Sequence, residues 1–167
     1  MTPQKTLDAL ELLEADHQAV RKLFAAYREL AAHDAPEARR KALAEQICME
    51  LTIHARLEEE LFYPMVREAI RDDDLMDEAE VEHASAKDLI VQILSMDPHE
   101  ELYDAKVTVL GEYIEHHVRE EQDEMFPKVR KCGLDLLALG ERLRVRQREL
   151  HAVPEALRED IIVSMMA

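Results

Sequence analysis

HARLEEELFYP, residues 54–64, returns in altered form as HVREEQDEMFP at residues 117–127. In each copy a glutamate follows the histidine by four residues, Glu58 after His54 and Glu121 after His117. Residues four apart lie on one face of an α-helix, so each copy would place an imidazole beside a carboxylate. The sequence therefore predicts two helices that each present this pair of side chains.

The two copies belong to a longer internal repeat. His17 precedes the first copy at nearly the separation by which His83 precedes the second. Aligning these two histidines also aligns Arg21 with Lys87, Leu23 with Leu89 and Phe24 with Ile90. Each half is thus predicted to be a helix with one histidine followed by a helix with His-x-x-x-Glu.

The composition is that of an all-α protein, with three glycines, few aromatic residues and many leucines, alanines, glutamates and arginines. Helical periodicity and sparse turn signals predict helices over 5–33, 37–71, 76–95 and 98–131. Asp97 and Pro98 resemble a helix start, Gly133 follows a helix end, and Pro64 and Pro127 should kink their helices. Short loops favour an up-down-up-down four-helix bundle.

We expect one metal-binding bundle over residues 1–131 and a helical extension over residues 132–167. The extension is predicted from a helix-like stretch, a break at Pro154 and a last apolar piece, IIVSMM. Apolar surface needs a cover. The extension should therefore either dock on the bundle or form a dimer contact.

The charge balance excludes some classes of partner. With 21 Lys and Arg against 37 Asp and Glu, the net charge is −16, which disfavours nucleic acids and anionic membranes as partners. Cys48 and Cys132 are too few and too scattered for a disulfide framework, and no apolar run approaches the ~20 residues of a membrane span. These features predict a soluble, cytoplasmic protein, a monomer or a homodimer.

Charged side chains interrupt the apolar stripes of the four predicted helices at matching positions. Six side chains lie within the stripes: His17, His54, Glu58, His83, His117 and Glu121. A buried carboxylate costs several kcal/mol unless it is paired or metal-bound, so these residues predict a metal site, with a buried polar network as the alternative. Glu59, Glu60, Glu120 and Asp123 lie off the stripe and are predicted to be solvated.

Four imidazoles and two carboxylates exceed the four ligands of a closed zinc site, and the absence of thiolates disfavours copper(I) and iron–sulfur clusters. Two ions, each with two histidines and sharing both glutamates, would use every ligand. Mixed nitrogen and oxygen ligation favours iron, with manganese or zinc as possible substitutes. An alternative, as in ferritin-like bundles, would use Glu14 and Glu80 and leave His54 and His117 without a role.

The pattern His, His-x-x-x-Glu, His, His-x-x-x-Glu over residues 17–121 resembles the hemerythrin-like HHE cation-binding family. The resemblance implies an oxo- or hydroxo-bridged di-iron centre in an up-down bundle, with four terminal histidine ligands and bridging Glu58 and Glu121. The oxygen-carrying hemerythrins have a further histidine where this chain has Lys87. The six-ligand pattern is instead more similar to di-iron proteins of iron–sulfur repair and nitric-oxide stress.

Three functions fit these residues. The centre could bind or sense O2, NO, H2O2 or iron in oxidative or nitrosative stress, with a protein partner to receive the signal. It could instead be a di-iron oxidoreductase that consumes peroxide or nitric oxide, or an iron donor for iron–sulfur repair. A purely structural polar core is the third possibility. The same ligands serve binding and turnover, so the sequence leaves open whether the protein is an enzyme.

Overall fold

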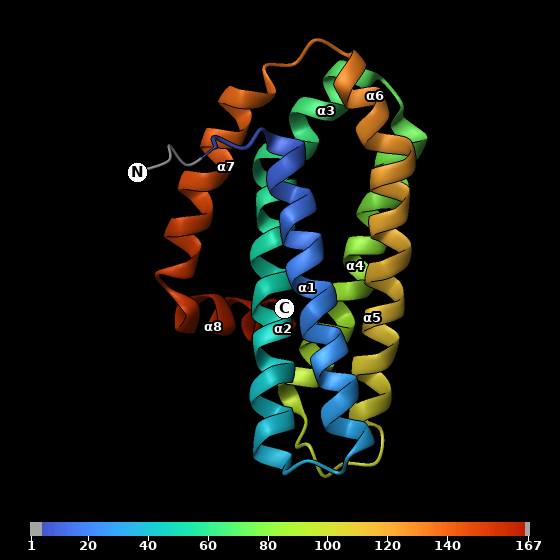
Figure 1. Cartoon of the computed structure of the whole chain (residues 1–167), viewed down its shortest axis with the longest axis vertical. Helices are drawn as coiled ribbons and strands as arrows, with labels where there is room; N and C mark the ends of the chain where they lie inside the picture. The colour runs from blue at the N-terminus through green and yellow to red at the C-terminus, as the bar shows by residue number, and fades with distance from the viewer. Residues whose placement is uncertain (1–4, 166–167) are drawn as a thin grey trace.

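The computed structural model describes residues 5–165, in which every regular element is helical. Four long helices run antiparallel to their neighbours (Figure 1): α1 (Ala9–Ala32), α2 (Glu37–Leu57), α4 (Asp73–Ser95) and α5 (Tyr103–Glu120). The predicted up-down-up-down bundle is confirmed. Residues 1–4 and 166–167 lie outside the described part. The start of the predicted bundle segment 1–131 and the end of the predicted extension 132–167, including Met166 of IIVSMM, therefore lie outside it too.

Shorter helical segments extend α2 and α5 at the upper end of the bundle in Figure 1. Two π-helical segments, η1 (Glu58–Phe62) and η2 (Glu121–Met125), lead into α3 (Tyr63–Ile70) and α6 (Phe126–Lys131). The C-terminal extension consists of α7 (Leu136–His151) and α8 (Pro154–Met165). No described helix is long and apolar enough to cross a membrane.

The four long helices form a square in which α1 contacts α2 and α5, and α4 contacts the same two helices. Their apolar stripes make two cores. An upper core gathers around Phe62 and Phe126, and a lower core around Tyr27 and Tyr103. The candidate metal ligands are not part of either apolar cluster, which leaves a polar layer within the buried interior of the bundle.

Side-chain caps fix several helix starts. Asp8 accepts a hydrogen bond from the backbone N–H of Glu11, so α1 begins at Ala9, and Asp72 caps α4 in the same way. The predicted helix start at Asp97 and Pro98 is wrong. Glu100 does bond back to the N–H of Asp97, but turns fill the segment to residue 102 and α5 begins only at Tyr103.

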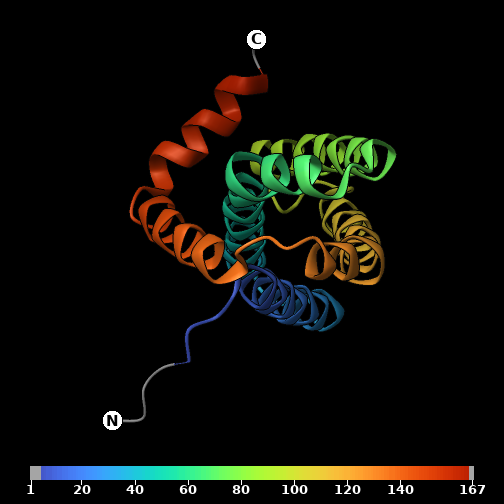
Figure 2. The same ribbon diagram turned by 90° about the horizontal axis from the view of Figure 1, so that it is seen from above.

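The two prolines follow π-helical segments rather than ordinary helix. In η1 the N–H of Tyr63 bonds to the carbonyl of Glu58, five residues back, which inserts one extra residue into the turn. Pro64, which has no N–H to donate, comes directly after this wide turn. Figure 2 shows α3 lying across the end of the bundle, so the kink predicted in this helix is confirmed.

The extra residue also shifts the apolar stripe. A regular 3.6-residue period would bury Leu61 and Met65, but Met65 is 37% exposed. Phe62 and Val66, each one residue later, are completely buried instead. Leu61 stays partly buried, but the regular period is wrong at Met65 and misses Phe62 and Val66, because it assumes an unbroken α-helix.

The C-terminal extension packs on the first half of the bundle. α7 contacts α1 and α2, and a Cβ at Gly140 would lie 2.7 Å from the carbonyl oxygen of Leu7, so only glycine allows this close approach. α8 is held against α2 by two ion pairs, Arg158 with Glu45 and Arg56 with Asp160. α7 and α8 thus both pack on the chain's own bundle. Whether the extension also forms a dimer contact stays a prediction.

Candidate metal centre

The bundle brings all six candidate ligands together, one histidine from each long helix and the two glutamates from the starts of η1 and η2. All six are buried: His17, His54, Glu58, His83, His117 and Glu121. Their ligand atoms form two groups of three, and within each group the atoms lie within 4.8 Å of one another. These groups have the size and the donor types of metal sites.

The two groups combine the halves of the repeat. One contains His17 and His54 of the first half with Glu121 of the second. The other contains His83 and His117 of the second half with Glu58 of the first. Each group therefore combines two imidazoles of one half with a carboxylate of the other, although each glutamate lies closest to an imidazole of its own half.

Each glutamate lies between imidazoles of both halves. Oε1 of Glu58 is 3.1 Å from Nε2 of His54 and 3.4 Å from Nε2 of His83. Oε1 of Glu121 is 2.7 Å from Nε2 of His117 and 3.8 Å from Nε2 of His17. A carboxylate in this position can contact ions at both groups, which is the geometry expected of a bridging ligand.

Several buried atoms of the centre have no hydrogen-bond partner. They include both carboxylate oxygens of Glu58 and Glu121, both ring nitrogens of His17 and Nε2 of His54. Burying such groups without compensation costs several kcal/mol each. Metal cations would supply the missing interactions with all of these donors except one nitrogen of His17, so the residues present fit bound metal ions.

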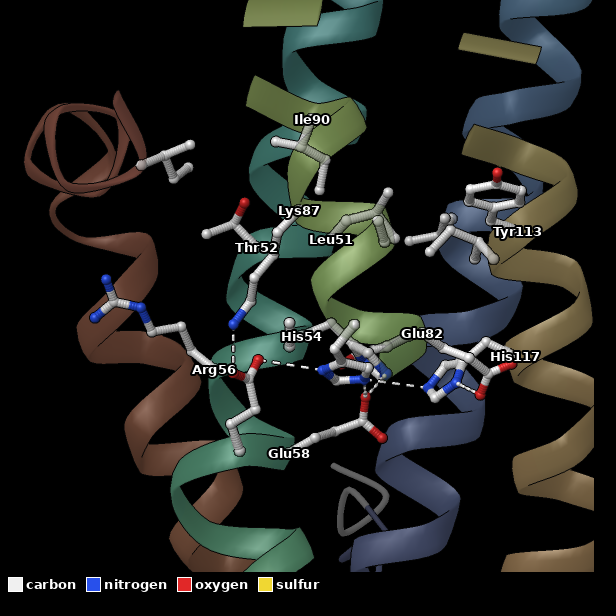
Figure 3. Close-up of a pocket in the computed structure, with 18 of the residues that line it drawn as sticks. Leu51, Thr52, His54, Arg56, Glu58, Glu82, Lys87, Ile90, Tyr113 and His117 are labelled. Atoms are coloured by element: carbon white, nitrogen blue, oxygen red, sulfur yellow. Dashed lines mark hydrogen bonds and ion pairs between the residues drawn. The ribbon is translucent and has the colours of Figure 1, made fainter. Parts of the chain in front are cut away.

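Three of the four imidazoles donate their outer nitrogen to a carboxylate. Nδ1 of His54 lies 3.1 Å from Asp16, Nδ1 of His83 lies 3.1 Å from Glu59, and Nδ1 of His117 lies 2.9 Å from Glu82. Such bonds fix the tautomer and leave Nε2 free to face a metal. Figure 3 shows Glu82 directly beside His117.

The contacts of these outer carboxylates with the imidazoles were not predicted from the sequence. Glu59 is exposed, as predicted, but it also bonds His83 and forms an ion pair with Lys87. Asp16 and Glu82 were not considered, although each directly precedes the histidine on the first helix of its half. This shared Asp/Glu-His dipeptide is the signal that could have identified them.

Aromatic residues at equivalent places of the repeat differ between the halves. Tyr63 precedes Pro64 as Phe126 precedes Pro127. The Tyr63 hydroxyl lies 3.1 Å from Nε2 of both His83 and His117, whereas Phe126 stacks on His17 with ring centroids 6.1 Å apart. A hydroxyl therefore reaches only one imidazole pair, and periodicity alone gave no sign of it.

Burial and neighbouring charges shift the pKa values of the centre in opposite directions. Burial, with the adjacent His54, lowers the pKa of His17 to about 3, which keeps this imidazole neutral. Burial opposes a charge on His54, but Glu58 and Asp16 outweigh it and raise its pKa to about 10. Burial and the Glu58 charge raise the pKa of Glu121 to about 7, so without a cation this pair of glutamates takes up a proton readily.

Other residues singled out in the sequence lie outside the two groups. His116 is exposed, with its imidazole between Glu82 and Glu120. Asp123 is exposed, as predicted. Glu14 and Glu80 occur in no described metal-sized cluster, so the ferritin-like alternative finds no support in the geometry.

Comparison with known proteins agrees with this architecture. A curated relative, a DNA nickase from Nostoc sp., is 29% identical over 127 residues, which are 76% of this chain but only 35% of that protein. The chain thus spans about a third of this relative's length. The fold resembles the crystal structure of a hemerythrin HHE cation-binding domain-containing protein from Mycobacterium kansasii, with a TM-score of 0.77, 24% identity, and coverage of 95% of this chain and 99% of that one.

A family comparison matches residues 8–129 to the hemerythrin HHE cation-binding domain. The match includes both copies of the His-x-x-x-Glu motif and the two earlier histidines. With most of the sequence matched and the candidate ligands clustered in a helical bundle, the chain belongs to the hemerythrin HHE cation-binding domain family.

Proposed function

We propose that the centre binds two iron ions, one beside His17 and His54 and the other beside His83 and His117, with Glu58 and Glu121 shared. The observation that carries this proposal is the position of each glutamate between imidazoles of both halves. A single ion at either group would leave at least one buried glutamate without a hydrogen-bond partner, Glu58 in one case and Glu121 in the other.

The donor set favours iron. The ligands are imidazoles and carboxylates, and the two cysteines take no part, because neither occurs in a described metal-sized group. Two adjacent iron ions with open coordination positions can take up O2, NO or H2O2 and change oxidation state together. The function we propose is binding of these small ligands in oxidative or nitrosative stress or in iron sensing.

The chain's own residues prepare this chemistry. Asp16, Glu59 and Glu82 hold three imidazoles in the tautomer that presents Nε2. Burial and the charges of Glu121 and Glu58 raise the pKa of Tyr63 well above its usual range, so its hydroxyl stays a neutral hydrogen-bond donor. Lys87, which stands where the oxygen carriers have a fifth histidine, is paired with Glu59 and would not serve as a metal ligand.

Metal analysis and an optical spectrum of aerobically purified protein test the proposal. We expect two iron ions per chain; one ion per chain, or zinc alone, would contradict it. Reduced protein exposed to oxygen should oxidise and stay oxidised after the gas is removed. Spontaneous return to the reduced state would restore the oxygen-carrier interpretation.

The second candidate function is turnover of peroxide or nitric oxide, favoured by Lys87, which pairs with Glu59 in place of a fifth histidine ligand. Multiple turnovers of H2O2 or NO per chain would establish an oxidoreductase, and single-turnover binding would leave the sensing role. Transfer of iron to an apo iron–sulfur protein would identify an iron donor instead.

We extend no nickase activity to this chain, because a net charge of −16 opposes binding to the phosphate backbone and most of the Nostoc protein lies outside the matched region. A sensing role would require a protein partner. The free cysteines Cys48 and Cys132 favour a reducing compartment, the cytoplasm.

A further inference from the structure

A cavity of about 390 Å³ adjoins the candidate metal centre on the side of the lower core. Its floor consists of five of the six candidate ligands, His17, His54, Glu58, His83 and His117. Figure 3 shows Leu51 and Ile90 above this floor, with Tyr113 on the far side. The cavity is larger than the small ligands of the proposed function need.

Size is the first argument for a larger occupant. A water molecule takes about 30 Å³, so two ions and one bridging group of that size would leave roughly 300 Å³. An apolar protein cavity of about 150 Å³ is enough to admit benzene, and pockets for small organic ligands begin near 300 Å³. The remaining space is therefore in the range of an organic molecule rather than of a diatomic gas.

The walls are the second argument. They are built from apolar side chains of five helices: Val20, Leu51, Ile90, Val91, Ile114 and Ile161. Apart from those of Glu121, which does not line the cavity, the partnerless polar atoms of the centre belong to floor residues. An occupant would thus meet mainly apolar side chains along its length, with unpartnered polar groups at the floor and the paired charges of Arg56 and Lys87 at the mouth.

The mouth of the cavity argues against a charged occupant. Arg56 and Lys87 stand there on the side of the C-terminal segment (Figure 3). Lys87 is already paired with Glu59, and Arg56 with Asp160 of α8. An anion would have to displace one of these carboxylates and then approach the buried glutamates, and both steps are electrostatically unfavourable.

We propose that this cavity binds an uncharged organic molecule of benzene or phenol size, with an apolar body against Leu51 and Ile90 and its polar end towards the metal centre. The proposal extends the proposed function by naming a second class of ligand at the same centre. It rests on the cavity walls and needs no particular metal, so iron content and organic binding are measured separately.

The test uses toluene and phenol as probes in saturation-transfer NMR with the full chain. Ala86 lines the cavity, and Ala84 lies exposed on the same helix. Ala86→Phe would place a phenyl ring where the proposal puts the ligand, and Ala84→Phe is the matched control. We expect binding by the wild type, at least a tenfold weaker affinity in Ala86→Phe, and less than a twofold change in Ala84→Phe.

Equal affinities in the two variants, or no transfer to either probe in the wild type, would overturn the proposal. If Ala86→Phe does not fold, wild-type protein loaded with manganese replaces it. Bound Mn²⁺ should then broaden the phenol resonances far more than it does in the presence of excess chelator, and equal broadening would overturn the proposal. Iron bound at two per chain without probe binding would leave the proposed function intact and remove only this inference.

Discussion

The two halves of the repeat offer the same three candidate ligands but surround them differently. In the second half, His83 and His117 each donate to a carboxylate, and the Tyr63 hydroxyl lies 3.1 Å from Nε2 of both. In the first half only His54 has such a carboxylate, while His17 lies against Phe126 with both ring nitrogens unbonded. The repeat specifies the donors, and the neighbouring residues make the two positions unequal.

The outer contacts differ as well. Asp16, which holds His54, receives a hydrogen bond from Gln147 of α7, so the C-terminal extension supports the first half. Glu82, which holds His117, lies beside the exposed His116 instead. The two halves of the bundle thus differ because α7 supports Asp16 in the first half and the Tyr63 hydroxyl contacts the two histidines of the second. The following experiments break or sharpen this comparison, from the largest expected effect to the smallest.

Removal of the metal should have the largest effect, because Glu58 and Glu121 then face each other in the buried centre. A loss of about 2 kcal/mol moves the Tm of a chain this size by roughly 4–8 °C, and we expect at least this drop on chelation. Differential scanning calorimetry of chelated and metal-loaded samples measures it. Coinciding melting curves would show that metal does not stabilise the centre.

The metal-free protein should be more stable at pH 6.5 than at pH 8. In the folded protein the pKa of Glu121 is raised to about 7 and that of His54 to about 10. Each shift favours the folded state most at a pH below the ordinary pKa of the group, and this stability is lost as the pH rises through the pKa of the folded protein. The pKa of His17, lowered to about 3, acts only below about 6.5. Chelated samples melted at both values test the sign, and a higher Tm at pH 8 would contradict it.

Loss of either glutamate proposed as a shared ligand should empty both positions. Glu58→Ala and Glu121→Ala each remove a side chain that lies between the two halves, so metal content should fall towards zero rather than to one ion. Asp123→Ala, an exposed change in η2, is the control and should alter stability by less than ~0.5 kcal/mol. Retention of one tightly bound ion in either glutamate variant would argue against shared ligands.

Removal of an outer carboxylate should have a smaller and one-sided effect. Asp16→Asn weakens the support of His54, and Glu82→Asn weakens that of His117, so each variant should lose about 10–100-fold in metal affinity at its own position. Competition with a chelator measures the two affinities. Asp88→Asn, an exposed change on α4, is the control. An identical loss at both positions in each variant would mean that the halves do not act separately.

Tyr63→Phe should have the smallest effect, because it removes one hydrogen bond worth about 1 kcal/mol. It makes the aromatic residue of the first half match Phe126 and should leave metal content unchanged. Mössbauer spectra of the iron-loaded protein should show two different iron environments in the wild type and more similar ones in the variant. Unchanged spectra would mean that the hydroxyl does not distinguish the positions.

The ordinary helical period was enough to predict much of this molecule. The stripes on the four long helices, with the histidines and glutamates inside them, follow from 3.6 residues per turn and from the rule that buried charges need a partner. The period failed at Met65 and at Asp97. Before Met65 a π-helical turn adds one residue, so the apolar face shifts. After Asp97 turns continue to residue 102 and the helix begins only at Tyr103, although Glu100 bonds back to the N–H of Asp97.

The sequence by itself determined the all-helical bundle, its repeat and which six side chains share its interior, because these depend on spacing along one chain. Only the tertiary structure decided that each ligand group combines two imidazoles of one half with a glutamate of the other, that the exposed Glu59 bonds His83, and that Tyr63 reaches two histidines at once. Contacts between helices depend on how their axes pack and rotate, and periodicity within one helix carries no information about that packing.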